Sequence, residues 1–134
     1  MKIYPITPVP KPRMTQRDKW KSRDCVQRYW NYKDLVKIHN VRLPDTSSYH
    51  VVFLIPMPIS WSGKRKNAAI YTPHLSRPDK DNLEKGLLDA IYGEDAHVWT
   101  GESSKLWSDV GAIVIFPKEF DFGLVDMIKK HMRC

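Results

Sequence analysis

The sequence predicts a small single domain of the α+β class, with helices packed on a mixed β-sheet. At 134 residues the chain has the size of one ordinary domain, and neither an internal repeat nor a second domain divides residues 1–134. Its composition, 42% apolar and 28% charged, is typical of globular proteins. Two continuous apolar runs, VVFLIPMPI and VGAIVIF, have the form of buried strands, and segments with helical spacing accompany them. Strands and helices mixed along one chain indicate the α+β class.

The N-terminal third predicts an edge strand, an arm and a helix. Residues 3–7 (IYPIT) alternate weakly between apolar and polar, and Pro5 confines such a strand to a sheet edge. Residues 8–23 are rich in proline, lysine and arginine and lack periodicity, which predicts an extended basic arm. Residues 24–38 fit an amphipathic helix that begins near Ser22 or Asp24. The positions that follow its helical spacing are Val26, Tyr29, Trp30, Lys33 and Val36.

The remaining sequence predicts two buried strands, a long basic loop and two further helices. Residues 49–56 (YHVVFLIP) carry apolar residues in both alternating sets, so we expect a strand that is buried on both faces. Residues 57–78 form a long basic loop, and a helix follows over residues 79–92, beginning between Asp79 and Asp81. Residues 110–116 predict another buried strand. A closing helix is expected within residues 118–133 (KEFDFGLVDMIKKHMR).

The net charge of +7 is gathered in the arm, in the long loop and at the C-terminus. Clustered bases interleaved with tryptophan suggest a polyanionic partner, of which nucleic acid is the common one. The alternative is that these bases lie on solvated loops and helix ends. The candidate DNA contacts, which would hold the phosphate backbone without reading sequence, are Lys11, Arg13, Arg17, Lys19, Lys64, Arg65, Lys66 and Arg77.

Other features predict a cytoplasmic protein without a membrane partner. The longest apolar runs are too short to cross a bilayer, and the N-terminal residues lack the apolar core of a signal peptide. The two cysteines, Cys25 and Cys134, have neither metal-site spacing nor a disulfide framework, which fits a reducing compartment.

The acidic residues are unevenly distributed as well. Of the 15 in the chain, eight fall between Asp79 and Asp109, around the helix predicted over residues 79–92. At about 100° per residue one face of this helix is an apolar stripe that ends in Ala90 and Ile91. The opposite face carries Asp81, Asn82, Lys85 and Asp89. Acids near a helix N-terminus can be simple first-turn residues that favour the helix dipole. They can also form a site for a hard cation.

A magnesium site is the chemical alternative to capping. Mg²⁺ prefers oxygen ligands and usually binds through one or two carboxylates. Water molecules and a substrate phosphate fill its other coordination positions. Asp79 and Asp81 can converge at the junction of loop and helix, and the GED turn can return Glu94 or Asp95 to the same place. A metal there would polarise a phosphodiester and activate water. Lys85 would neutralise charge on the phosphate or the leaving group.

The run SWSGKRKNA…PHLSRPDKDNLEKGLLDAIYGEDAHVW resembles the RusA family of Holliday junction resolvases, which are small enzymes common in phages and prophages. The family signature reads here as Pro78, Asp79, Asp81, Asn82, Lys85, Asp89 and Ala90, with Glu94 and Asp95 as the later acidic pair. The resemblance implies a homodimeric, Mg²⁺-dependent endonuclease, with Mn²⁺ as a substitute, that nicks two strands of a four-way junction symmetrically. It further implies a phage- or prophage-encoded protein in the bacterial cytoplasm.

The resemblance also assigns roles. Asp79, Asp81 and Asp95 would be the catalytic metal-binding acids and Lys85 the catalytic lysine, with Asn82 and Asp89 in support. Because only AIYG separates Asp89 from Glu94, a shorter connection than the family pattern, Glu94 stays open as the third acid and Asp109 as a remoter one. His74 is expected to be a packing residue of the loop, and Trp61, Trp99 and Trp107 are expected to be packing or dimer residues. Two other functions stay open: a non-catalytic nucleic-acid-binding phage protein, and a Mg²⁺-dependent nuclease acting on flaps or RNA.

Overall fold

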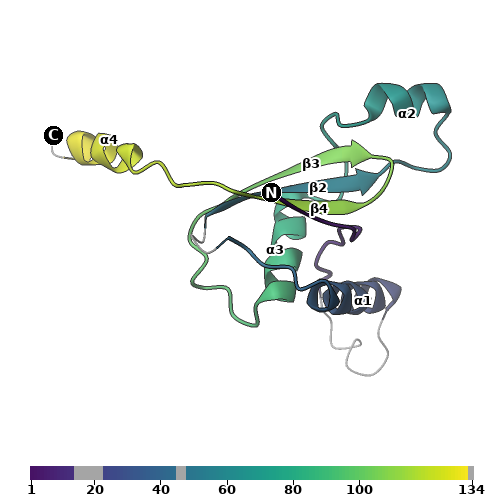
Figure 1. Ribbon diagram of the computed structural model, residues 1–134, viewed down its shortest axis with the longest axis horizontal. Coiled ribbons are helices and arrows are strands. Elements are labelled where there is room, and N and C mark those ends of the chain that lie inside the picture. The colour runs from purple at the N-terminus through teal and green to yellow at the C-terminus, as the bar shows by residue number, and fades with distance from the viewer. Residues whose placement is uncertain (14–22, 45–47, 133–134) are drawn as a thin grey trace.

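A four-stranded mixed sheet forms the centre of the molecule (Figure 1). The computed structural model describes residues 1–13, 23–44 and 48–132. The strands lie in the order β1 (Lys2–Tyr4), β4 (Ala112–Pro117), β2 (Tyr49–Pro56) and β3 (Glu102–Ser108). The strand β4 is antiparallel to both of its neighbours, β1 and β2, whereas β2 and β3 are parallel. The predicted α+β class and mixed sheet are therefore confirmed.

The strand β2 has the predicted bounds but not the predicted burial. Tyr49, Val51 and Phe53 are buried in the core, whereas the alternating Val52 and Leu54 are only partly covered. Helices pack on one face of the sheet, so only one set of side chains is enclosed. The prediction of burial on both faces is wrong for this strand.

Two helices, α1 (Asp24–Ile38) and α3 (Lys80–Ile91), cover that face and contact each other (Figure 1). Both were predicted. Ser22 lies outside the described residues, Arg23 takes the N-cap position of α1, and Asp24 lies in the first turn. The buried stripe of α1 uses Tyr32 in place of Trp30, whose side chain is 42% exposed, so the sequence placed that part of the stripe wrongly.

The helix α3 is the crossover between the parallel strands β2 and β3. Parallel neighbours require such a connection, because a tight turn cannot join them. Its apolar stripe is confirmed: Leu83, Leu87 and Ala90 are buried, and Ile91 packs against the core. The opposite face of α3 is left for the candidate site.

Three elements differ from the prediction, and a fourth, α4, forms where it was expected. The N-terminal strand covers only Lys2–Tyr4, although its edge position is confirmed. A short helix, α2 (Gly63–Ala69), lies within the predicted loop. The strand β3 was missed because its sequence, ESSKLWS, is largely polar. The helix α4 (Gly123–Met132) forms as predicted but buries no residue and projects from the body (Figure 1).

No helix among the described ranges is long and apolar enough to cross a membrane.

We predict that Gly101→Ala destabilises the fold. A Cβ atom at Gly101 would lie 2.3–2.8 Å from three ring atoms of Tyr49, whose side chain is only 2% exposed and cannot move freely. Overpacking of this kind typically costs about 1–3 kcal/mol. The control is Gly93→Ala, where a Cβ meets nothing within 4 Å. Urea unfolding should show a lower free energy of unfolding for Gly101→Ala alone, and equal effects of the two substitutions would contradict this packing argument.

Candidate metal and nucleic-acid site

The two leading acids lie at the N-terminus of α3. Asp79 occupies the N-cap position, yet its carboxylate makes no capping hydrogen bond. Asp81 is exposed in the first turn of the helix. N-cap acids stabilise helices mainly by accepting hydrogen bonds from the first-turn amides. Because Asp79 does not do so, its carboxylate is available to another group, and capping alone does not account for it.

The loop that delivers Asp79 is held by Lys105 of β3. The Lys105 ammonium group donates hydrogen bonds to the carbonyl oxygens of Ser76 and, at 2.7 Å, of Pro78. The backbone N–H of His74 donates to the Lys105 carbonyl at 3.1 Å. The segment before α3 is thereby tied to the edge of the sheet. The sequence analysis missed Lys105, and only its position in the acidic region, opposite a polar loop, could have pointed to it.

His74 and two tryptophans serve packing, as predicted. The His74 ring is 3% exposed and lies 4.1 Å from the Trp107 ring, between centroids. Trp107 in turn lies 4.8 Å from Trp61. Burial, followed by the nearby charge of Lys105, lowers the pKa of His74 below its ordinary value of 6.5. The ring is therefore neutral at neutral pH.

This lowered pKa predicts an acid-sensitive stability. Below pH 6.5 the unfolded chain binds a proton at His74 more readily than the folded one, so the free energy of unfolding falls as the pH falls. The hydrogen bond from Lys118 lowers the pKa of Glu102. Protonation of Glu102 therefore reduces the free energy of unfolding only below pH 4.5, the ordinary pKa of a glutamate, and does not contribute between pH 7.5 and 5.5. Urea unfolding at pH 7.5 and 5.5 should therefore show a smaller drop for His74→Gln than for the wild type. Equal drops would show that His74 does not cause this dependence.

Four predicted site residues converge on one groove. Lys11, Pro12, Arg13, Asn82 and Lys85 line an open hollow of about 560 Å³ along the outer face of α3. The arm residue Lys11 donates its backbone N–H to the Asn82 carbonyl at 3.4 Å. The structure therefore brings the beginning of the basic arm to the face of α3 that carries the proposed catalytic lysine.

Two further contacts hold the arm on α3, and a hydrogen bond from α1 fixes α3 beside them. The Lys11 ammonium group forms an ion pair with Asp89, which thus supports the arm. A Cβ at Gly86 would lie 3.1 Å from backbone atoms of Val9 and Lys11, so glycine permits the close approach. The Tyr29 hydroxyl donates to the Gly86 carbonyl at 2.8 Å, and burial, followed by the charge of Asp89, raises its pKa to about 12. Tyr29 therefore remains a donor over the working pH range.

The candidate third acids lie elsewhere around α3. Asp95 is close enough to act on Tyr49: burial, then the charge and hydrogen bond of Glu84, and then Tyr92 and Asp95, raise the pKa of that tyrosine. Glu94 is exposed and accepts a hydrogen bond from the Ala96 N–H at 3.1 Å. The sequence analysis missed the neighbourhood of Tyr49 and Glu84, because a tyrosine at the start of a buried strand carries no signal for it.

Within residues 1–13, 23–44 and 48–132, no three His, Cys, Asp or Glu side chains gather closely enough to hold a metal ion. Asp79, Asp81 and Asp95 therefore do not form one cluster in the single chain. The donor set at the start of α3 nevertheless fits Mg²⁺, since two free carboxylates with water and a phosphate oxygen meet its usual requirement. Asp109, the remoter candidate, is exposed beyond the end of β3.

The other predicted DNA contacts are spread over the molecule. Lys64, Arg65 and Lys66 belong to α2, which lies beyond one end of the sheet and away from α1 (Figure 1). The Arg65 guanidinium stacks 3.9 Å from the centroid of the Trp61 ring. Arg77 is exposed in the loop before α3. Arg17 and Lys19 lie outside the described residues. The basic clusters thus present two separate surfaces.

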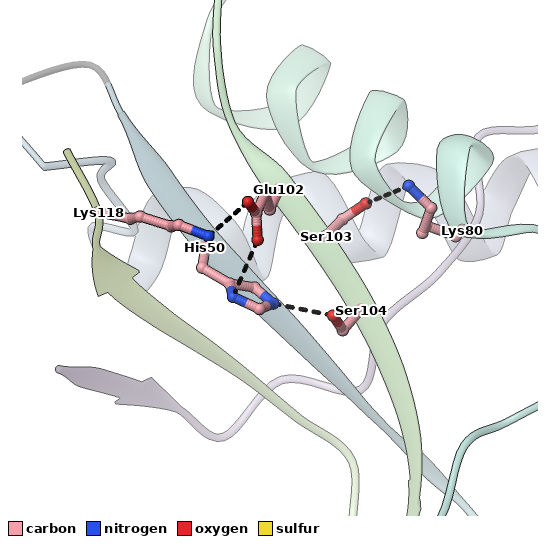
Figure 2. Close-up of polar contacts among 6 residues, drawn as sticks. All are labelled: His50, Lys80, Glu102, Ser103, Ser104 and Lys118. Carbon is pink, nitrogen blue, oxygen red and sulfur yellow. Dashed lines mark hydrogen bonds and ion pairs between the residues drawn. The ribbon is translucent and has the colours of Figure 1, made fainter. Parts of the chain in front are cut away.

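A polar network ties the strands together at one end of the sheet (Figure 2). His50 Nε2 lies 2.8 Å from Ser104 Oγ, and His50 Nδ1 lies 3.6 Å from Glu102 Oε2. Glu102 also pairs with Lys118, which follows β4. On the α3 side, Lys80 reaches Ser103 at 3.4 Å. These contacts link α3, β2 and β3 to the chain after β4, so they brace the sheet beside the candidate site.

Comparison with protein families found one match: the family described as endodeoxyribonuclease RusA, over residues 5–116. Comparison with curated proteins gave no match. Comparison with solved structures gave none either. The matched segment contains β2, β3 and all but the last residue of β4, together with α1, α2 and α3, and it begins just after β1. It includes the free acids of α3 and the basic groove, and it ends within β4, so α4 lies outside it. This 134-residue chain therefore belongs to the RusA family of endodeoxyribonucleases.

Proposed function

We propose that this protein is a Mg²⁺-dependent, structure-selective endonuclease that resolves four-way DNA junctions by paired, symmetric nicks. The observation that carries the proposal is the pair of free carboxylates, Asp79 and Asp81, next to a groove lined by Lys11, Arg13 and Lys85. Basic residues attract a phosphate backbone, whereas carboxylates beside it repel phosphate unless a cation lies between them. A metal-assisted phosphodiesterase satisfies both sets of residues.

The residues divide the chemistry as follows. Hydrolysis joins a water oxygen to phosphorus and breaks one bond between phosphorus and a sugar oxygen, which leaves with a proton. Bound Mg²⁺, with Mn²⁺ as a substitute, would supply polarisation of the phosphoryl oxygen and activation of the water. Asp79 and Asp81 would hold the ion. Lys85, which lines the groove, would neutralise charge that develops on the phosphate or the leaving oxygen. Asn82 would contact the same phosphate.

We propose Asp95 as the third acid in preference to Glu94. The Glu94 carboxylate already accepts the Ala96 N–H, which closes a local turn. Asp95 instead lies near Tyr49, whose side chain also meets Glu84 in the second turn of α3. Among the described residues no hydrogen bond of its own turn engages the Asp95 carboxylate, so it would remain available to a metal ion.

We further propose a homodimer in the cytoplasm of a bacterial host, encoded by a phage or prophage. A two-fold dimer presents two identical sites, as a nearly symmetric four-way junction requires for paired cuts. The basic residues of the N-terminal arm and of α2 would then hold several of the DNA duplexes that meet at the junction, through their phosphates.

The deciding experiment incubates the protein with a labelled synthetic four-way junction and with a linear duplex of matched sequence, each with Mg²⁺, with Mn²⁺ and with EDTA. Paired nicks on the junction alone, dependent on the metal, are expected. Equal cutting of the linear duplex, or cutting only of flaps or RNA, would keep the metal site and remove the junction selectivity. Salt-sensitive binding of both DNAs without cleavage would identify a non-catalytic DNA-binding protein.

A further inference from the structure

The helix α4 is an amphipathic helix whose apolar face has no cover. It lies beyond the segment matched by the RusA family, which ends at residue 116. At about 100° per residue, its large apolar side chains fall on one side, with His131 among them, and Asp126, Lys129 and Lys130 fall on the other. Those apolar side chains are Leu124, Met127, Ile128 and Met132, which are 47%, 67%, 58% and 77% exposed. A surface helix with this pattern normally buries its apolar stripe.

The segment before α4 is fixed to the body and directs the helix outward. Its aromatic rings pack in a cluster, with Phe120 lying 5.2 Å from Trp99 and 5.0 Å from Phe122, between centroids. Asp121 then starts the helix, since its carboxylate accepts the Gly123 N–H at 2.9 Å. In Figure 1 the extended chain after β4 carries α4 away from the sheet. These contacts hold α4 where it does not cover its own molecule.

The sheet has an apolar face that also lacks a cover. The strand registers place Ile3, Val114 and Val52 in one row across it, and Leu54 next to Leu106 in another. Ile3 is 60% exposed and Val52, Leu54 and Leu106 are partly exposed, whereas Val114 between its two neighbours is only 7% exposed. His50 and Ser104 of the polar network lie at one end of the same face, so its apolar part is the stretch from Val52 to Leu54 with Ile3 and Leu106. Among the elements that the structure describes, α1 and α3 lie on the opposite face, and no helix lies across this one (Figure 1).

We propose that α4 of one copy of this chain packs its apolar face on the open sheet face of a second copy, and that the second copy returns the contact. The partner is a second copy because each chain carries one of each surface, the apolar face of α4 and the open face of the sheet. Two copies can therefore cover all four surfaces. The sizes agree: ten helical residues span about 15 Å and strands of six to eight residues about 20–27 Å. The exchange gives each sheet its second helical layer. This proposal rests on one part of the proposed function, the two-fold dimer, and it specifies the contact between the two subunits.

The first test measures the dimer by sedimentation velocity over a range of protein concentrations. Ile128→Asp places a charge in the apolar face of α4 and should raise the dimer dissociation constant at least about thirty-fold, as for an interface hot spot. The control is Lys129→Glu, on the polar face, which should leave the constant within about threefold. A dimer equally tight in wild type and Ile128→Asp would overturn the proposal, as would a wild-type monomer at every concentration.

The second test identifies the surface that α4 contacts and does not depend on nuclease activity. Cys25 and Cys134 are first replaced by serine. A copy with Leu54→Cys is then mixed, under oxidising conditions, with a tagged copy carrying Ile128→Cys. A disulfide between the two different copies is expected, and Lys129→Cys in place of Ile128→Cys should give little. A third variant carries Leu54→Cys and Ile128→Cys in one chain. If a disulfide forms within that chain and none forms between the two singly substituted copies, α4 covers its own sheet and the proposal is wrong. Loss of junction cleavage with an intact cross-link would contradict the nuclease function alone.

Discussion

Asp81→Asn is expected to lower the rate of junction cleavage by at least about a thousandfold, with Asp79→Asn behaving alike. Metal ions contribute several kcal/mol of transition-state stabilisation in phosphoryl chemistry, and each 1.4 kcal/mol corresponds to about a factor of ten. Both side chains are exposed and make no capping bond at the start of α3. Replacing a charged oxygen by an amide should therefore remove the ion without disturbing the fold.

Junction binding should survive in these variants and can become tighter, because a negative charge beside the phosphates is gone. The measurement is single-turnover cleavage of a labelled junction together with a gel-shift titration in EDTA. The matched control is Asp34→Asn, which changes an exposed acid on α1. Cleavage at the wild-type rate by either variant would show that the start of α3 is not the metal site. Equal losses of cleavage and binding would point to a damaged fold.

Lys105→Met is expected to slow cleavage by about a hundredfold while leaving junction affinity nearly unchanged. Lys105 does not line the basic groove, but it holds the carbonyl oxygens of Ser76 and Pro78 and so the loop that delivers Asp79. A displacement of about 1 Å at a reacting centre can cost a hundredfold in rate. Methionine keeps the length of the side chain and removes both hydrogen bonds, which leaves the loop free to shift.

The deciding readout is the Mg²⁺ dependence of the rate, because a merely destabilised protein would lose active molecules, and so lower the apparent kcat, without changing that dependence. For Lys105→Met we expect a lower kcat, an unchanged KM for the junction and a higher Mg²⁺ concentration for half-maximal rate. Lys105→Arg, which keeps a charged donor, should recover part of the rate. Lys37→Met, on the exposed side of α1, is the control. An unaltered Mg²⁺ dependence in Lys105→Met would refute the positioning role.

The regular elements with strong periodicity could be predicted from the sequence. The helix α1, the strand β2 and the helix α3 occur where the apolar spacing places them. The helix α2 and the strand β3 could not be predicted, because a seven-residue helix is short and ESSKLWS carries no apolar alternation. The edge strand β3 exists because it pairs in parallel with β2, and pairing depends on a partner distant in the chain.

The same division applies to the candidate site. The signature around α3 identifies the family, and through it the acids Asp79, Asp81 and Asp95 and the lysine Lys85 as candidates; these roles stay predictions. Sequence spacing did not reveal that Lys11 pairs with Asp89, since 78 residues separate them. Nor did it reveal that Tyr49 meets Glu84.

What the sequence alone determined is the kind of protein: its class, the bounds of its main helices and its family. These rest on local periodicity and on residue types at fixed spacing, which are properties of the chain before it folds. Only the tertiary structure decided which residues support the site. The crossover through α3 makes β2 and β3 neighbours, and it thereby sets Lys105 against the loop before Asp79. Contacts between distant segments arise from packing, which spacing along the chain does not encode.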